Sequence, residues 1–261
     1  MALPRLLRSP FPRHPPDIDQ AFARWLESPL GQALVAEERE LLAQVLPSLA
    51  GTRAVQLGVG RPVPLLEASR MPLRWTLGLR EGELRASPEA LPLAKRSMDL
   101  VLLHHSLDFA DRPHQVLREA VHSLDHGGHL VVVGFHPVSL WGLARLFRLG
   151  RGQVPWAGRF LRPHRVSDWL HVLACRAEGL ESGFHNLPLQ GERARRRLGW
   201  LERAGQRAWS QHGAFYVLVA RRQAVNMRPL REHAEAAQEP IPNVVPVSMA
   251  RWRRQTREEQ S

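Results

Sequence analysis

The sequence predicts an α/β protein with a mostly parallel sheet that is covered by helices on both faces. Residues 98–104 and 129–135 are almost continuously apolar, as expected for strands buried on both faces. Between them, residues 113–124 place apolar side chains at helical spacing, and the glycine pair 127–128 is expected to end that helix. A further apolar run at residues 54–57 leads into a glycine-rich turn, a feature of nucleotide-binding α/β proteins. For 261 residues, one such domain with some extra helix fits better than two.

The glycine-rich turn is the first candidate site. Gly58 and Gly60 are one residue apart, and glycine lets a ligand approach the backbone because it lacks a Cβ. The third glycine of the dinucleotide-binding fingerprint is missing from this sequence. The turn alone therefore leaves two interpretations open, a ligand-binding loop and a plain connection from strand to helix.

Helix start signals define the N-terminal part and the middle of the chain. Asp17 is expected to cap a first helix, and Ser28 to cap a second one that has Pro29 at its first position. Asp111 is expected to cap a later helix that Pro113 opens. The helices we expect are residues 17–26, 29–46, 64–69, 113–124, 139–151 and 165–175. The strands we expect are residues 53–57, 74–79, 98–104, 129–135, 177–184 and 214–221; the third strand of the order is not visible in the sequence, and residues 83–87 could supply only a vestige of it.

Several motifs in residues 52–133 occur in the order seen in a known family. They are the turn at Gly58 and Gly60, the pair Leu91-Pro92, the strand start Ser97-Met98-Asp99, and the helix-to-strand segment 117–133 with Gly127-Gly128. Together they resemble class I S-adenosylmethionine-dependent methyltransferases, in particular the methyltransferase type 11 group. Residues 134–143 are similar to a small bacterial methyltransferase-like subfamily with the motif G-F-[NH]-P-x-S-x-x-G-L.

This resemblance implies a three-layer α-β-α Rossmann-like methyltransferase fold. Its mostly parallel sheet has seven strands or slightly fewer, its last strand is antiparallel, and N-terminal helices are added. We expect residues 1–16 to form a flexible arm, residues 17–223 the methyltransferase-like domain, and residues 224–261 a disordered basic tail. The domain would comprise N-terminal helices at 17–50, a cofactor half at 51–137 and an acceptor half at 138–223.

The resemblance also implies which residues bind S-adenosylmethionine. The expected cofactor ligands are Gln56, Gly58, Gly60, Glu81, Ser87, Pro88 and His104. Three positions depart from the family pattern: Gln56 and Ser87 stand where acids are usual, and Arg80 lies nearer the ribose position than Glu81. Because a hydrogen bond to a charged group contributes about 1.5–3 kcal/mol and a neutral one about half of that, these departures predict weakened cofactor binding.

Histidines at the expected strand ends are the candidate catalytic groups. His105 and His136 are candidate general bases, because the histidine pKa lies near neutrality. The alternative is that each is a strand-end histidine bonded to the backbone. Among the thirteen histidines, His122 and His126 alone have H-x-x-x-H spacing, and a single cysteine cannot form a Cys-His zinc motif, so we expect no metal site. Cys175 lies on the apolar side of an expected helix and is interpreted as a core residue.

Composition limits the remaining function classes. A formal charge of +11 is typical of proteins that bind a polyanion, such as nucleic acid or an acidic membrane surface. Lys95 is the only lysine, and GC-rich codons encode arginine, so codon composition explains much of the arginine and a nucleic-acid partner is possible but not favoured. The single cysteine rules out an internal disulfide, and no apolar run reaches signal-peptide or membrane-spanning length. We therefore expect a cytoplasmic protein without a transmembrane segment.

Two functions follow from these observations. The first is an S-adenosylmethionine-dependent methyltransferase that acts on an unknown acceptor, with residues 139–151 as an apolar roof over the acceptor pocket. The second is a catalytically inactive protein of the same fold that binds nucleic acid or a protein through its arginine-rich segments, such as residues 195–197. The missing carboxylates at Gln56 and Ser87 favour the second function, whereas the fold motifs favour neither.

Overall fold

The structure is a computed structural model, and it describes residues 18–59, 63–78, 84–148, 154–184 and 213–223. Contacts divide the chain into Met1–Ala224 and Val225–Ser261, and the second unit lies entirely outside the described residues. So do the expected arm at residues 1–16, the arginine run at 195–197, and the candidate ligands Gly60 and Glu81.

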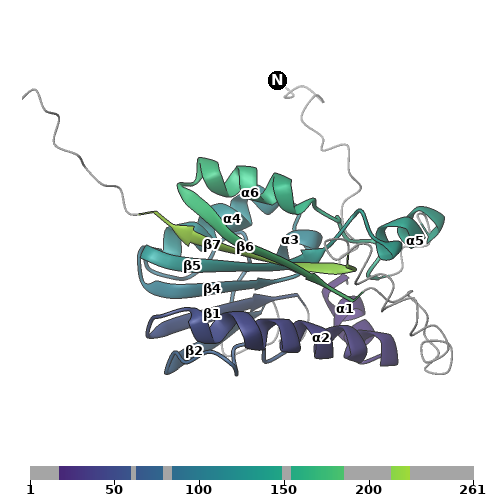
Figure 1. The fold of residues 1–261 in the computed structure, drawn as a ribbon, viewed down its shortest axis with the longest axis horizontal. Coiled ribbons are helices and arrows are strands. Elements are labelled where there is room, and N and C mark those ends of the chain that lie inside the picture. Colours follow the sequence, from purple (N-terminus) through teal and green to yellow (C-terminus); the bar gives the residue numbers. More distant parts are fainter. Residues whose placement is uncertain (1–17, 60–62, 79–83, 149–153, 185–212, 224–261) are drawn as a thin grey trace, which may run out of the picture. The chain divides into compact units, whose positions relative to one another are not determined.

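A seven-stranded sheet in the order β3-β2-β1-β4-β5-β7-β6 forms the centre of the first unit (Figure 1). The strands are β1 (Arg53–Gly58), β2 (Leu73–Gly78), β3 (Leu84–Arg85), β4 (Met98–His104), β5 (Leu124–Phe135), β6 (Cys175–Gly183) and β7 (Phe215–Arg222). Strands β1 to β5 pair in parallel, whereas β7 runs antiparallel to both β5 and β6. The predicted Rossmann-like α/β fold is confirmed.

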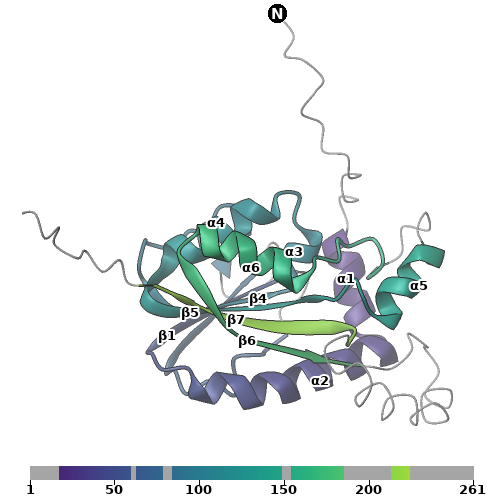
Figure 2. The same ribbon diagram turned by 45° about the horizontal axis from the view of Figure 1, so that its top comes forward.

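Helices cover both faces of this sheet. They are α1 (Ile18–Leu26), α2 (Pro29–Val45), α3 (Ser106–Phe109), α4 (Pro113–Ser123), α5 (Leu140–Arg148) and α6 (Pro163–Val172), with a short 3-10 turn, η2 (Leu46–Ser48), after α2. Figures 1 and 2 show α2 on one face and α4 and α6 on the other. The expected N-terminal layer is therefore present, and it lies directly against the sheet.

Strand β4 shows why the central strands are apolar throughout. Leu100 and Leu102 pack into the core beneath α1 and α2. Val101 and Leu103 pack into the opposite core, beneath α4 and α6. Because successive strand side chains point to opposite faces, the next residue, His104, faces the side of the sheet that α2 covers.

Local signals explain where the N-terminal helices begin and how closely they approach. Ser28 Oγ accepts a hydrogen bond from the Gly31 amide at 3.1 Å, and Pro29 opens α2, as predicted. A Cβ on Gly31 would lie 2.3 Å from the Trp25 carbonyl oxygen. Glycine at this position therefore lets the start of α2 contact the end of α1, which fixes the path of α2 along the sheet.

One predicted helix is wrong. Residues 64–69 form an extended segment and a turn. Two prolines limit helix formation here, and the buried Gln56 amide binds this segment instead, accepting from Leu65 N and donating to the Val63 carbonyl oxygen. The turn therefore closes back onto β1.

Two boundaries around α4 also differ from prediction. Arg112, and not Asp111, occupies the N-cap position, and the Arg112 amide donates to Glu89 Oε1 at 2.9 Å. Strand β5 begins at Leu124, so the glycine pair expected to end the helix lies within the strand. Gly127 has a φ of 78°, a conformation that glycine adopts without strain.

Helix α3 was not predicted. Among the described residues, no helix is long and apolar enough to cross a membrane.

Candidate functional site

The carboxyl ends of β1, β4 and β5 meet at one edge of the sheet. Gly58 is the register partner of His104, and His104 is the partner of Val133. Ligands of open α/β sheets bind outside this edge. Of the candidate ligands, the structure therefore brings Gly58 and His104 together.

Ser87 and Pro88 lie in a turn near the same edge. The Ala86 amide donates to the Gly78 carbonyl oxygen at 3.0 Å, which holds the turn against the end of β2. Ser87 is exposed, and its Oγ accepts from the Glu89 amide at 3.3 Å. The Ser87 hydroxyl thus lies near the same edge as Gly58 and His104, and its contact with a cofactor stays a prediction.

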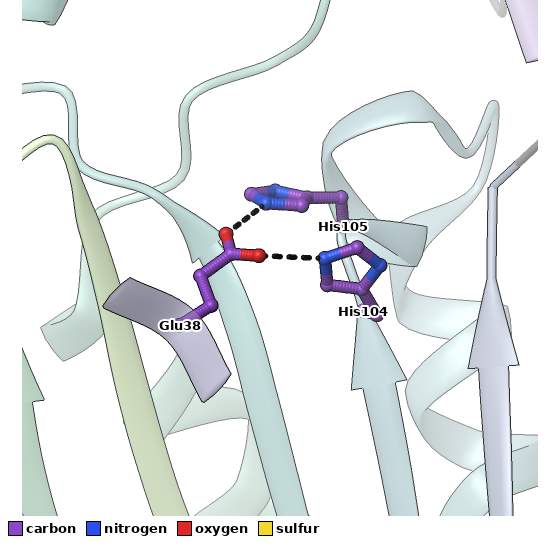
Figure 3. Close-up of side chains that lie close together, drawn as sticks. All are labelled: Glu38, His104 and His105. Carbon is purple, nitrogen blue, oxygen red and sulfur yellow. Dashed lines mark hydrogen bonds and ion pairs between the residues drawn. The ribbon is translucent and has the colours of Figure 1, made fainter. Parts of the chain in front are cut away.

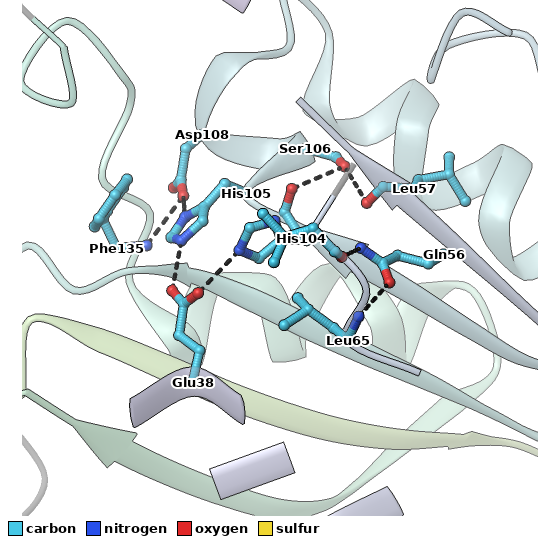
Figure 4. A network of polar contacts seen from close by, with 10 residues as sticks. Glu38, Gln56, Leu57, Leu65, His104, His105, Ser106, Asp108 and Phe135 are labelled. Carbon is cyan, nitrogen blue, oxygen red and sulfur yellow. Dashed lines mark hydrogen bonds and ion pairs between the residues drawn. The ribbon is translucent and has the colours of Figure 1, made fainter. Parts of the chain in front are cut away.

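Gln56 occupies the acid position at the end of β1, and its amide is engaged by the chain itself. Its side chain is fully buried. Nε2 donates to the Val63 carbonyl oxygen at 2.6 Å, and Oε1 accepts from Leu65 N at 3.1 Å (Figure 4). This geometry supports a structural role for Gln56, which holds the segment that follows the glycine turn. Direct contact of Gln56 with a cofactor stays a prediction.

Two adjacent histidines at the end of β4 share one carboxylate. His104 Nε2 lies 2.9 Å from Glu38 Oε2, and His105 Nε2 lies 2.8 Å from Glu38 Oε1 (Figure 3). His105 has a φ of 52°, which breaks the strand alternation and lets both rings reach the same helix, α2. None of the three side chains is more than 1% exposed.

Asp108 extends this cluster on the far side of His105. Its Oδ2 lies 2.8 Å from His105 Nδ1 and also accepts from the Phe135 amide at 3.0 Å. Ser106 Oγ donates to the Leu57 carbonyl oxygen at 3.1 Å. Figure 4 shows that these contacts join α2, α3 and the ends of three neighbouring strands into one polar network.

Burial and charge set different protonation states for the two histidines. Burial lowers the pKa of His105, but the carboxylates of Glu38 and Asp108 outweigh it and raise that pKa to about 9. Burial lowers the pKa of His104 more than Glu38 raises it. For Glu38, burial raises the pKa, but the two histidines lower it to about 2. At neutral pH, His105 is therefore charged and His104 is neutral.

His136, the other candidate base, lies outside this cluster. It is 8% exposed, and its Nδ1 accepts from the Val138 amide at 3.1 Å. Its own amide donates to the Ala214 carbonyl oxygen at 2.9 Å, which joins the end of β5 to the start of β7. His136 therefore has the backbone contacts of a strand-end histidine.

Sequence reasoning missed Glu38 and Asp108. Residues 37–40 contain three acids and one arginine and read as a solvated face. A usable signal was present, because Glu38 lies four residues from both Leu34 and Leu42, which are fully buried, and residues four apart share a helix face. An acid within an apolar stripe predicts a buried, paired carboxylate.

Only part of the expected apolar roof faces inward. Trp141 on α5 is fully buried and packs against Phe135 and Trp156, with ring centroids 6.1 and 5.4 Å away. Leu140 and Leu143 are 37% and 53% exposed. Trp141 is therefore the side chain of this helix that closes over the edge of the sheet. Cys175 is buried, as expected of a core residue, but the expected helix location is wrong: α6 ends at Val172 and Cys175 begins β6.

Comparison with known proteins finds one family match, in the middle of the chain. Residues 67–132 match the family described as "Methyltransferase domain". This segment runs from the turn before β2 to β5 and includes His104, His105 and Asp108, but neither Glu38 nor the motif at 134–143.

A curated relative resembles this chain in sequence, and solved structures resemble it in fold. Escherichia coli YafS, an uncharacterized protein, is 40% identical over 107 residues, which are 41% of this chain and 44% of YafS. The chain thus spans less than half the length of that relative. A Thermotoga maritima S-adenosylmethionine-dependent methyltransferase, described as a possible histamine N-methyltransferase, has a TM-score of 0.51 at 18% identity, over 78% of this chain and 95% of its own. The [4+2]-cyclase SpnF has a TM-score of 0.55 at 16% identity, over 83% of this chain and all of its own. At these identities, the two structures show a shared fold.

Proposed function

We propose that the protein is an S-adenosylmethionine-dependent methyltransferase that acts on a small-molecule acceptor. The observation that carries this proposal is the methyltransferase-domain match at residues 67–132, on a mostly parallel sheet whose last strand, β7, is antiparallel as predicted. The match lies mainly on strands β2, β4 and β5, whose carboxyl ends line the ligand-binding edge. The methyl donor and the acceptor would both bind at this edge.

The described residues fit the cofactor as a weak site. Gly58 would allow close approach to the β1 turn, and Ser87 with Pro88 would line the adenine side. Among the proposed ligands that the structure describes, none carries a carboxylate, and Gln56 already binds Val63 and Leu65. A neutral donor set loses the charge assistance that a carboxylate gives to a ribose diol, so we expect lower affinity than is usual for the family.

The cofactor supplies the methyl group, and the chain supplies orientation and, for a weak nucleophile, a base. Both ring nitrogens of His105 face carboxylates, so His105 has no lone pair to offer an acceptor while it is an imidazolium. The other predicted base, His136, already accepts from the Val138 amide at Nδ1, so we propose that the chain promotes transfer by orienting the acceptor. Trp141 would shape the acceptor side, since it closes over Phe135 from α5.

A catalytically inactive binding protein of the same fold is the second candidate. It is favoured by the Gln56 amide, which holds the chain's own turn at the position where an acid is usual. Calorimetric titration with S-adenosylmethionine and S-adenosylhomocysteine separates the two. Heat of binding with a rise in melting temperature supports the first function. Neither effect at millimolar cofactor would leave the inactive protein as the better description.

A further inference from the structure

Three metal-ligating atoms converge at the end of β4. Among the described residues, Glu38, His104 and His105 each place one ligand atom within 4.8 Å of the other two. His104 Nε2 lies 2.9 Å from one Glu38 oxygen, Oε2, and His105 Nε2 lies 2.8 Å from the other, Oε1. Ligands of a tetrahedral ion at about 2.1 Å are about 3.4 Å from one another, so small side-chain adjustments suffice to admit an ion.

The hydrogen-bond pattern around His105 favours an ion at this position. A carboxylate on Nδ1 fixes the tautomer in which Nδ1 carries the proton, and Asp108 Oδ2 lies 2.8 Å from that nitrogen. In neutral His105, the lone pair of Nε2 then faces an oxygen of Glu38 at 2.8 Å. Two lone pairs at this distance repel unless a proton or a cation lies between them.

We propose that Glu38, His104 and His105 bind a divalent transition-metal ion, with Asp108 as a positioning residue that orients His105. Two imidazoles and one carboxylate suit zinc and ions with similar ligand preferences. Three protein ligands leave a further position for water or a substrate atom. Phe135 stacks on His105 at 4.0 Å and Phe22 meets it edge-on at 5.5 Å, so apolar rings shield the site.

The metal proposal does not depend on methyl transfer, although it assigns the predicted cofactor ligand His104 to the ion. Because Gly58 pairs with His104 in the sheet, the ion would lie beside the β1 turn, on the α2 side of the sheet. Glu38 comes from α2, and His104 lies 66 positions further along the chain. Binding would therefore tie the N-terminal helices to the ligand-binding edge.

The test uses full-length protein without a histidine tag, because a tag would itself bind metal. Chelator-treated protein is titrated with Zn²⁺ and Co²⁺ in equilibrium dialysis, and bound metal is measured by mass spectrometry. We expect about one ion per chain, a Co²⁺ ligand-field absorption band that Zn²⁺ abolishes, and a higher melting temperature with metal.

Variants locate the ion. Glu38→Gln and His104→Ala should lose the site, and Asp108→Asn should weaken it by about 10–100-fold. His164→Ala is the matched control, because His164 pairs with Asp168 at 3.2 Å on the surface, where the two side chains are 89% and 62% exposed. Equal binding by wild type and Glu38→Gln would overturn the proposal. The proposal would also be overturned if wild-type protein bound no ion and showed no cobalt band. That result does not depend on any variant being folded, and it would mean that protons alone bridge the cluster.

Discussion

Leu65 donates its backbone amide to the side-chain oxygen of Gln56 at 3.1 Å, so the segment after the glycine turn is held by the residue at the end of β1. Both residues are buried, and the Gln56 nitrogen donates to the Val63 carbonyl oxygen as well. This pair explains why a glutamine is compatible with the position where the family resemblance places an acid: the amide can donate and accept, and a carboxylate can only accept.

Gln56→Glu should therefore destabilise the protein. The new carboxylate oxygen would face the Val63 carbonyl oxygen, where Nε2 now donates at 2.6 Å. Loss of this buried bond should cost about 1–3 kcal/mol, measured as a lower free energy of unfolding in urea. Ser87→Asp is the comparison, because Ser87 is exposed: it should leave stability unchanged and tighten S-adenosylmethionine binding. A stable Gln56→Glu variant would contradict this account of the turn.

Gly58→Val should abolish cofactor binding, because a β-branched side chain at the end of β1 blocks approach to the backbone. Calorimetry with S-adenosylmethionine measures the loss, and circular dichroism checks the fold. Gly179→Val is a suitable control, since the nearest atom to a Cβ at Gly179 is Val219 Cβ at 4.0 Å. Affinity that is the same in Gly58→Val and wild type would place the pocket elsewhere.

Asp99 should contribute stability that is lost in acid. Burial raises its pKa, but hydrogen bonds from the amides of Thr52 and Arg53, both 2.9 Å long, outweigh this and leave the pKa lowered. A group whose pKa is lower in the folded state stabilises the fold above its unfolded pKa, and that stability disappears as the pH falls through the folded value. Urea unfolding from neutral pH to about pH 3 should show a steeper loss for wild type than for Asp99→Asn. Parallel profiles for the two proteins would exclude Asp99 as a source of the acid sensitivity.

Trp141→Ala should be strongly destabilising, because the side chain is fully buried among aromatic rings. Removing a buried tryptophan costs about 3–5 kcal/mol, measured by urea unfolding. Leu143→Ala, at a position that is 53% exposed on the same helix, should change stability by less than about 0.5 kcal/mol. A similar cost at both positions would show that α5 is not seated through Trp141.

Residues 139–151 also have the pattern of an interfacial helix, which would place Trp141 and Phe147 in an anionic bilayer. Trp141 is buried instead and Leu143 is exposed, so an interfacial α5 would insert Leu143, and Leu143→Ala would then reduce co-sedimentation with vesicles. We expect neither vesicles nor nucleic acid to bind wild type above background at physiological salt. Binding of wild type that falls steeply with salt would instead indicate a polyanion partner.

Local signals were enough to predict most elements of the fold. The apolar run of β4 was identified with its observed bounds, because a strand buried on both faces needs apolar residues throughout. The start of α2 followed from Ser28 and Pro29, whose effects act within one turn. The failed helix at residues 64–69 shows the limit: a buried amide from β1 decided the path of that segment.

The sequence by itself determined the fold class, the strands and the two adjacent histidines at the end of β4. Only the tertiary structure decided that Glu38 joins them, because periodicity shows which face of a helix is buried and not which strand end it meets 66 positions later. The close approach of α2 to α1 at Gly31 and the left-handed turn at His105 bring that carboxylate and both rings together. Contacts between distant segments therefore made the candidate site, while contacts between neighbours made the elements that carry it.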